Sequence, residues 1–163
     1  MADTCPLIAI RIALHVSAAI DPIAAQVVLD DSDLDVWQVP RNAYREALAS
    51  FAEMQAWRVT PLGAYLVDAL EGVGEMAAGA GFQIGKTYAL GDSPLVLLTA
   101  LQSSFEAWPS SSRSQLLPTP VLDDTGAYTG EVVADRTIRV WSDLDMRLLM
   151  ADLNAKLTQN IPS

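Results

Sequence analysis

Segments typical of strands and segments typical of helices alternate along this chain, and this alternation limits the fold more than any other feature. Residues 7–16 (LIAIRIALHV) are rich in Ile and Leu and predict a buried strand, and residues 35–40 (DVWQVP) predict a short strand that Pro40 ends. Residues 21–30 lie between them and open with Asp-Pro, a typical helix start. Strands that alternate with helices predict an α/β fold with a largely parallel sheet flanked by helices.

The next segments continue this pattern. Residues 41–57 carry apolar side chains at helical spacing and predict one long helix, and a second helix is expected from Pro61. Residues 72–85 are rich in Gly and Ala and predict a loop or a helix end. The apolar positions of the helix predicted over residues 41–57 are Tyr44, Leu48, Phe51 and Met54.

The last third of the chain differs in composition. Residues 108–130 are rich in Pro, Ser, Thr, Asp and Gly and predict a long surface excursion. Residues 131–142 contain two β-prone runs, and residues 142–157 predict a closing helix. Ser142 and Asp145 have the spacing of a capping box at the start of that helix.

Length and composition predict one globular domain. The chain has 163 residues, which is enough for a substantial core, and 51% of them are hydrophobic. We therefore expect a single domain over residues 1–163. Ten Lys and Arg oppose twenty Asp and Glu, and this net charge of −10 disfavours binding to nucleic acid or to anionic membranes. Neither kind of partner is expected.

The sequence predicts a cytoplasmic protein. The longest apolar stretch, residues 6–20, is interrupted by Arg11 and His15 and is too short to span a bilayer. No basic region precedes this stretch, as one would in a signal peptide. Cys5 is the only cysteine, so the chain has no intramolecular disulfide, and this usage fits a reducing compartment.

Histidine and cysteine are too scarce for several kinds of site. With Cys5 and His15 as the only residues of their types, the chain cannot build a Cys/His zinc cluster. A Ser-His-Asp triad would need His15, which lies in an apolar stretch and is better explained as a partly buried structural histidine. A metal ion would therefore be held by oxygen ligands, as calcium and magnesium are.

Three stretches look like known binding motifs but fail in detail. Residues 80–87 (AGFQIGKT) end like a phosphate-binding loop, but the leading glycine of that motif is Ala80 here. Residues 72–77 (GVGEMA) fit a dinucleotide fingerprint but follow a helix rather than a strand. Residues 30–35 (DDSDLD) alternate Asp like an EF-hand loop, yet Val36 stands where that loop needs glycine. We expect this last stretch to be a solvated turn.

Asp92 raises a question of its own, because it precedes the almost wholly apolar run SPLVLLTAL. Ser93 and Pro94 suit the N-cap and the first position of a helix, and a carboxylate beside them complements the positive helix end. A second interpretation is that Asp92 lies at the mouth of a site and binds a metal ion there. Asp123–Tyr128 is simpler and predicts a turn, with Gly126 supplying the unusual backbone angles.

Three stretches of the chain resemble the inosine-uridine preferring nucleoside hydrolase family. Residues 90–106 (LGDSPLVLLTALQSSFE) are similar to the segment in which an Asp ends a loop and an apolar helix follows. Residues 20–45 resemble the family's DP-x-A-A helix and the short strand that ends in Val-Pro. Residues 121–157 resemble its closing hairpin, strand and helix. The stretches occur in the family's order, so residues 20–157 resemble the C-terminal half of that fold, and residues 1–19 are a divergent start.

The resemblance implies hydrolysis of the N-glycosidic bond of ribonucleosides to base and ribose. In this family a calcium ion, held by carboxylates, binds the ribose hydroxyls and the attacking water, and a nearby Asp acts as the base. Such an ion lowers the pKa of its water and orients it for attack. By this resemblance, Asp92 occupies the position of the calcium-binding Asp in the C-terminal half, and calcium is the implied cofactor.

Other positions depart from the family pattern. Its signature D-x-D-x-x-x-D-D cluster, which supplies the base and most calcium ligands, is absent from this sequence, so no catalytic residue is assigned. Many members carry a His where this chain has Gly91, and the family's sugar-contacting Glu-Phe-Asn falls on other residue types. Those three positions are His15, Val16 and Ser17. One carboxylate cannot act as both ligand and base, so we expect no hydrolysis by the chain alone.

Three hypotheses follow. The chain is a nucleoside hydrolase portion that works as a homo-oligomer or with a complementing N-terminal half. Alternatively, it is a non-catalytic remnant that binds a ligand or a protein through apolar surface, in keeping with its mean hydropathy of +0.24. Thirdly, it is an unrelated α/β domain. The first two predict that Asp92 lies at a helix start, at the carboxyl edge of a parallel sheet.

Overall fold

A computed structural model describes residues 21–31, 34–101 and 111–159. The predicted strand over residues 7–16, together with Cys5 and His15, lies outside these residues. The described part is a mixed α/β fold, about 48% helix and 27% strand, with small sheets flanked by helices. It forms two compact units, one from residues up to Ala43 together with Ser112–Asp143, the other from the remaining residues. The single domain inferred from length stays a prediction.

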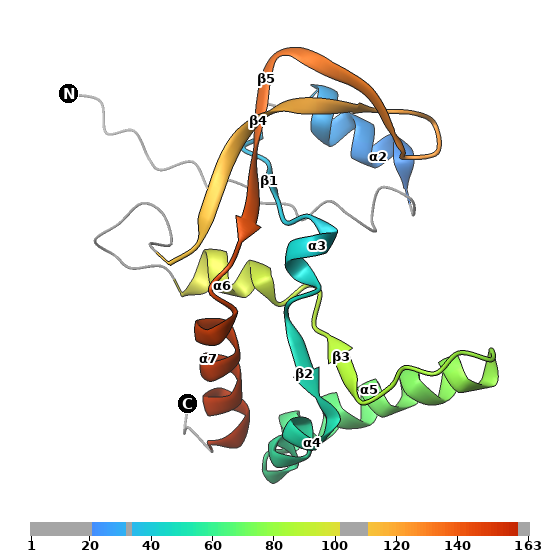
Figure 1. Ribbon diagram of the computed structural model, residues 1–163, viewed down its shortest axis with the longest axis vertical. Helices are drawn as coiled ribbons and strands as arrows, with labels where there is room; N and C mark the ends of the chain where they lie inside the picture. The colour runs from blue at the N-terminus through green and yellow to red at the C-terminus, as the bar shows by residue number, and fades with distance from the viewer. Residues whose placement is uncertain (1–20, 32–33, 102–110, 160–163) are drawn as a thin grey trace. The chain divides into compact units, whose positions relative to one another are not determined.

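The first unit contains a three-stranded sheet in the order β1-β5-β4, shown in Figure 1. Its strands are β1 (Trp37–Gln38), β4 (Arg113–Leu122) and β5 (Tyr128–Asp143). The short β1 runs parallel to β5, whereas β4 and β5 form a long antiparallel hairpin. Among the described residues the sheet is therefore mostly antiparallel, and the prediction of a largely parallel sheet is wrong there. A short turn can join only antiparallel neighbours, and the residues from 122 to 128 form such a turn.

The surface excursion predicted for residues 108–130 is also wrong where the structure describes it. Strand β4 occupies most of that range and includes Pro118 and Pro120. Proline cannot donate to a strand ladder, so prolines are tolerated at sheet edges and at irregularities. Strand β4 is at the edge of the sheet, and its register shifts at both prolines. Composition alone therefore misread an edge strand as a loop.

The turn predicted for residues 123–128 is confirmed and joins β4 to β5. The carboxylate of Asp123 accepts hydrogen bonds from the Thr125 hydroxyl, at 2.7 Å, and from the backbone N–H groups of Thr125 and Ala127. These bonds lower the pKa of Asp123, and the bond from the Thr125 hydroxyl has the largest effect. Gly126 has a φ of 79°, a conformation that favours glycine.

Helix α2 (Pro22–Gln26) and the π-helical turn η1 (Val27–Asp31) cover this sheet. Asp21 is the N-cap, and its carboxylate accepts a hydrogen bond of 2.9 Å from the Ala24 N–H, as the Asp-Pro opening predicts. The ring of Trp37 is fully buried and lies 4.9 Å from that of Trp141. The core beneath α2 comprises Ala25, Leu29, Val36, Leu122 and Ile138.

The single helix predicted over residues 41–57, most of which belong to the second unit, is wrong. The range contains α3 (Arg41–Tyr44), β2 (Leu48–Ser50) and α4 (Phe51–Met54), and η2 (Gln55–Val59) follows as a 3₁₀ helix. Strand β2 pairs with β3 (Thr87–Ala89), and Ser50 then caps α4 by accepting a hydrogen bond from the Glu53 N–H. Pairing with a distant strand overrides the local helical spacing.

The remaining helices of this unit are α5 (Pro61–Gly79), α6 (Pro94–Ala100) and α7 (Met146–Thr158). The helix expected from Pro61 is confirmed and runs further than predicted, into the Gly/Ala-rich stretch. It shares a core with β2, α4, η2 and α7. The buried residues of this core are Ala49, Met54, Trp57, Val67 and Leu157.

The closing helix is confirmed, but its predicted capping box is not. Ser142 lies in β5, and Asp145 is the N-cap of α7, accepting a hydrogen bond of 2.8 Å from the Leu148 N–H. The strand continues through Asp143 and so delays the helix start.

No helix in the described ranges is long and apolar enough to cross a membrane.

Candidate functional site

Asp92 lies in the turn between β3 and α6 with its side chain exposed. Helix α6 begins at Pro94, so the predicted helix start is confirmed. Ser93 occupies the N-cap position, but its backbone is already helical and its side chain makes no capping hydrogen bond. The polar cap expected from the Ser-Pro pair is therefore missing, and the first turn is held by backbone bonds such as that from the Leu95 N–H to the Asp92 carbonyl, 3.3 Å long.

The main chain is fixed on both sides of Asp92. The Leu90 N–H donates a hydrogen bond of 2.7 Å to the Ala47 carbonyl, and the Ser93 N–H donates one of 3.0 Å to the Leu90 carbonyl. These bonds fix the backbone from which the Asp92 side chain extends. The sheet beside it differs from the expectation, because β3 pairs with β2 in antiparallel fashion. Asp92 therefore stands at a helix start, but the described strands next to it do not form a parallel sheet.

Gly91 has a packing reason to be glycine. A Cβ atom at this position would lie 3.1 Å from Cδ2 of the buried Tyr44 ring. A histidine, the residue many members of the resembled family carry here, would need this ring to move. The space beside Gly91 is thus filled by Tyr44, a contact that the sequence did not indicate.

As a metal ligand, Asp92 could supply one carboxylate, which offers at most two oxygen atoms. Calcium takes six to eight oxygen ligands, so a complete site needs several more. No group of three or more His, Cys, Asp or Glu residues in the described ranges could hold a metal ion. The chemistry of Asp92 fits one position in a calcium site, and the described residues do not complete that site.

A small apolar cavity of about 180 Å³ lies in the second unit. Leu90 and Ser93, which flank Asp92 closely in sequence, contribute to its wall, and Trp57 lines another side. The remaining walls come from α5 and α7. They are Leu66, Ala69, Leu70, Leu153 and Leu157. The sequence does not indicate this cavity, because its walls come from four separate parts of the chain and share no motif.

A larger, shallow hollow of about 590 Å³ lies elsewhere in the same unit. It is formed by the second half of α5 and by the residues that follow this helix. Phe51 and Phe82 supply aromatic surface, and Glu71, Glu75 and Lys86 supply charges. Lys86 belongs to the stretch that looks like a phosphate-binding loop, but carboxylates at the same hollow disfavour a phosphate.

Comparison with models of known protein families and with functionally characterised proteins finds no match to this chain. The family resemblance therefore rests on the order and spacing of the segments in the sequence. Both Asp21 and Asp92 are exposed, and the carboxylate of Asp21 caps α2.

Proposed function

We propose that this chain is a nucleoside hydrolase-like protein and that Asp92 is one calcium ligand in a site that hydrolyses ribonucleosides. The observation that carries the proposal is the exposed carboxylate of Asp92 at the start of α6, held by a hydrogen-bonded main chain. The order of the three resembling segments, which include residues 20–45 and 121–157, supports it. The lone cysteine and the net charge of −10 fit a cytoplasmic protein that does not bind nucleic acid.

The remaining ligands and the base come from a second chain, either another copy or a complementing N-terminal half. When bound, calcium would position a water molecule and lower its pKa. The part of this chain is to hold one ligand at a fixed place. Because Asp92 is exposed, its carboxylate avoids the free-energy cost of burying an unpaired charge, and an ion in solution can reach it.

The test is release of ribose from a mixture of inosine, uridine and adenosine, with calcium and again with a chelator. The chain is assayed alone and mixed with the N-terminal half of a nucleoside hydrolase that carries the D-x-D-x-x-x-D-D cluster. If the N-terminal half supplies the missing ligands, we expect calcium-dependent release from the mixture only. Calcium-dependent release from this chain alone would show that a second copy supplies them. Asp92→Ala should lower that release by about 10- to 100-fold or more, as loss of a metal contact does.

The matched control is Asp124→Ala, which removes another exposed carboxylate, in the turn between β4 and β5. It should leave the release unchanged. Equal effects of the two substitutions, or release that does not need calcium, would contradict the assignment of Asp92.

A non-catalytic binding protein is the second candidate, and one observation favours it. Large apolar side chains are well exposed in both units, with Ile23 at 73%, Met76 at 70% and Phe82 at 69% of their full accessible surface. Surface of this kind marks binding sites when its members are contiguous. Absence of ribose release from the mixture, with both halves folded, would favour this function.

A further inference from the structure

Helix α5 has two apolar faces, and only one of them is covered. Val67 is fully buried, and Leu66 and Leu70 pack against the core of the second unit. A second set of positions recurs at alternating intervals of three and four residues, which places them on one side of a helix. This outer stripe consists of Leu62, Tyr65, Ala69, Gly72, Met76 and Gly79.

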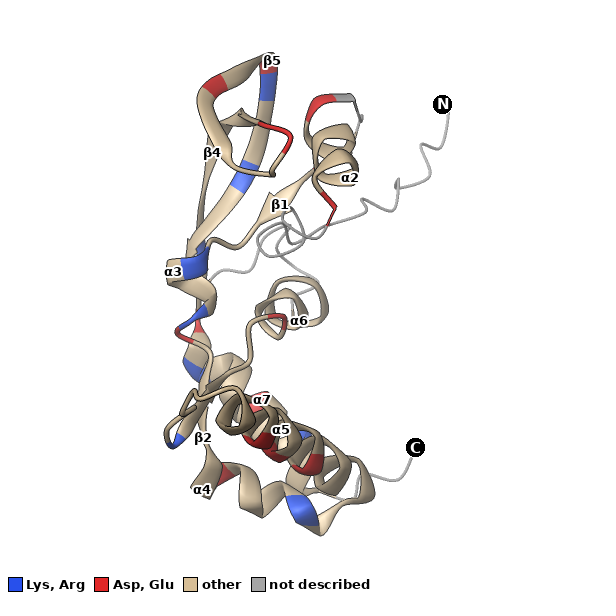
Figure 2. Ribbon diagram, turned by 90° about the vertical axis from the view of Figure 1, so that its right-hand side faces the viewer, with Lys and Arg blue, Asp and Glu red and all other residues tan. Residues whose placement is uncertain are grey.

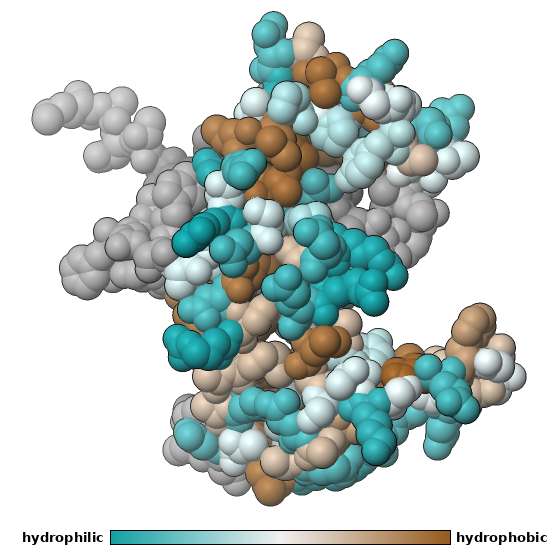
Figure 3. Space-filling model, in the orientation of Figure 1, coloured by the Kyte–Doolittle hydropathy of each residue, from teal (hydrophilic) through white to brown (hydrophobic). Residues whose placement is uncertain are grey.

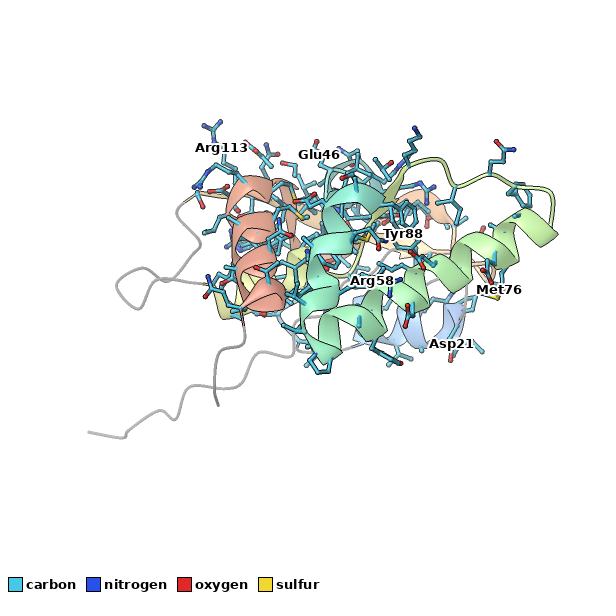
Figure 4. The ribbon with its side chains drawn as sticks, turned by 90° about the horizontal axis from the view of Figure 1, so that it is seen from below. Asp21, Glu46, Arg58, Met76, Tyr88 and Arg113 are labelled. Atoms are coloured by element: carbon cyan, nitrogen blue, oxygen red, sulfur yellow. The ribbon has the colours of Figure 1, made fainter. Side chains whose placement is uncertain are left out.

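The large side chains of the outer stripe are exposed to solvent. The exposed fractions are 60% for Leu62, 69% for Tyr65 and 70% for Met76. In Figure 4 Met76 lies on the edge of α5 turned away from Tyr88, the strand residue that packs on the core side. Figure 3 shows apolar atoms, tan and brown, reaching the surface along α5 and the segment that follows it. Three large apolar side chains aligned on one exposed helix face form a docking surface for another helix.

The charged residues of α5 itself are all negative. Helix α5 contains Asp68, Glu71 and Glu75 and no Lys or Arg, and Figure 2 shows red bands where α5 lies. Asp68 directly precedes Ala69 and Glu75 directly precedes Met76, so these two acids border the stripe. The only cation paired with α5 in the described residues is Arg58, which binds Asp68 at 2.6 Å and Glu71 at 2.8 Å.

The charge pattern selects the occupant. If α5 of a second copy packed on the stripe, the carboxylates of the two copies would face one another. Arg58 could not offset this repulsion, because it already pairs with Asp68 and Glu71 of its own chain. Like charges at such flanking positions oppose pairing, whereas opposite charges set the choice of partner. A helix with an apolar face bordered by Lys or Arg meets both the stripe and its acidic border.

We propose that the outer stripe of α5 docks an amphipathic helix with basic flanks, contributed by a protein partner. The proposal does not depend on the nucleoside hydrolase function, because Asp92 takes no part in it. Glu75 would face a cation of the partner, and Tyr65 and Met76 would pack on its apolar residues.

The test uses a fluorescent synthetic peptide as long as α5, with Leu at heptad positions and Lys elsewhere. Binding to the full chain is measured by fluorescence anisotropy at several salt concentrations. Tyr65→Ser and Met76→Ser keep the net charge, and each should weaken binding about tenfold or more. Glu75→Gln should weaken binding less and reduce its dependence on salt.

The controls are Ile23→Ser and Val96→Ser, which remove exposed apolar side chains from α2 and α6. Both should bind the peptide as the parent chain does. Because all four serine substitutions are at exposed positions, unchanged melting curves will show that each variant folds.

Three results would overturn the proposal. Equal weakening by the controls would show that the peptide binds by net charge alone. Unchanged binding by Tyr65→Ser and Met76→Ser would place the peptide elsewhere. Sedimentation that reveals a dimer of the chain abolished by Met76→Ser would make a second copy the occupant of the stripe.

Discussion

The indole nitrogen of Trp57 donates a hydrogen bond of 2.6 Å to the side-chain oxygen of Asn154, 97 positions away in the sequence. Asn154 in turn donates a bond of 2.6 Å to the carboxylate of Glu53. Trp57 is 1% exposed, so this amide satisfies a donor that water does not reach. One side chain of α7 thereby joins the two short helices α4 and η2.

Asn154→Leu should destabilise the protein by about 1–3 kcal/mol, because the Trp57 N–H would stay buried without an acceptor. The free energy of unfolding, measured in urea, checks this. Ala151→Leu places the same side chain at an exposed position of α7 and should change stability by no more than about 0.5 kcal/mol. Equal effects of both substitutions would contradict the role of the amide.

Gly63→Ala should destabilise α5, whereas Gly72→Ala in the same helix should not. A Cβ atom at Gly63 would lie 2.0 Å from the Trp57 carbonyl oxygen, so the backbone would have to move, at a cost of about 1–3 kcal/mol or more. A Cβ atom at Gly72 meets no described atom within 4 Å, and alanine there should add up to about 1 kcal/mol. Thermal melting of the two variants should shift in opposite directions.

Asp145 should make stability depend on pH in the acid range. The hydrogen bond from the Leu148 N–H is the main reason that the pKa of Asp145 is lowered, and Ser111 and the charge of Arg147 add to it. Because the folded pKa lies below the ordinary value of 3.8, this stabilisation is present above that value and is lost as the pH falls through the folded pKa.

Asp145→Asn keeps the capping acceptor but does not titrate. The variant should therefore match the parent near neutral pH and lose less stability between about pH 5 and pH 2. Urea midpoints across this range measure the effect. Asp124→Asn controls for the change in net charge and should leave the acid dependence as it is in the parent.

Asp92→Ala should change the free energy of unfolding by less than about 1 kcal/mol, because the described residues give its exposed side chain no hydrogen bond. Asp145→Ala, also at a helix start, removes a capping bond and should cost about 0.5–2 kcal/mol. Denaturation of the two variants compares them. A large loss with Asp92→Ala would mean that the carboxylate serves the fold rather than a ligand.

Local chemistry explains the elements that the sequence predicted well. The Asp-Pro pair at residues 21–22 begins α2, Thr60 and Pro61 begin α5, and Asp123 with Gly126 forms the hairpin turn. In each case the stabilising bond joins residues only a few positions apart. Such signals are complete in the sequence, because nothing distant is needed to satisfy them.

Tertiary structure decided the rest. Strand β2 forms inside a run with helical spacing because Leu48 pairs with the distant Ala89. Strand β4 contains two prolines, which the sheet tolerates because β4 is an edge strand with shifts in its register. The cavity lined by Leu90 and Ser93 and the contact of Tyr44 with Gly91 likewise depend on segments that meet only in the folded chain. The sequence by itself determined where α2, α5 and the hairpin turn begin, through short-range hydrogen bonds. The direction of the strands and the surroundings of Asp92 were decided by long-range pairing and packing, whose energy outweighs local preference.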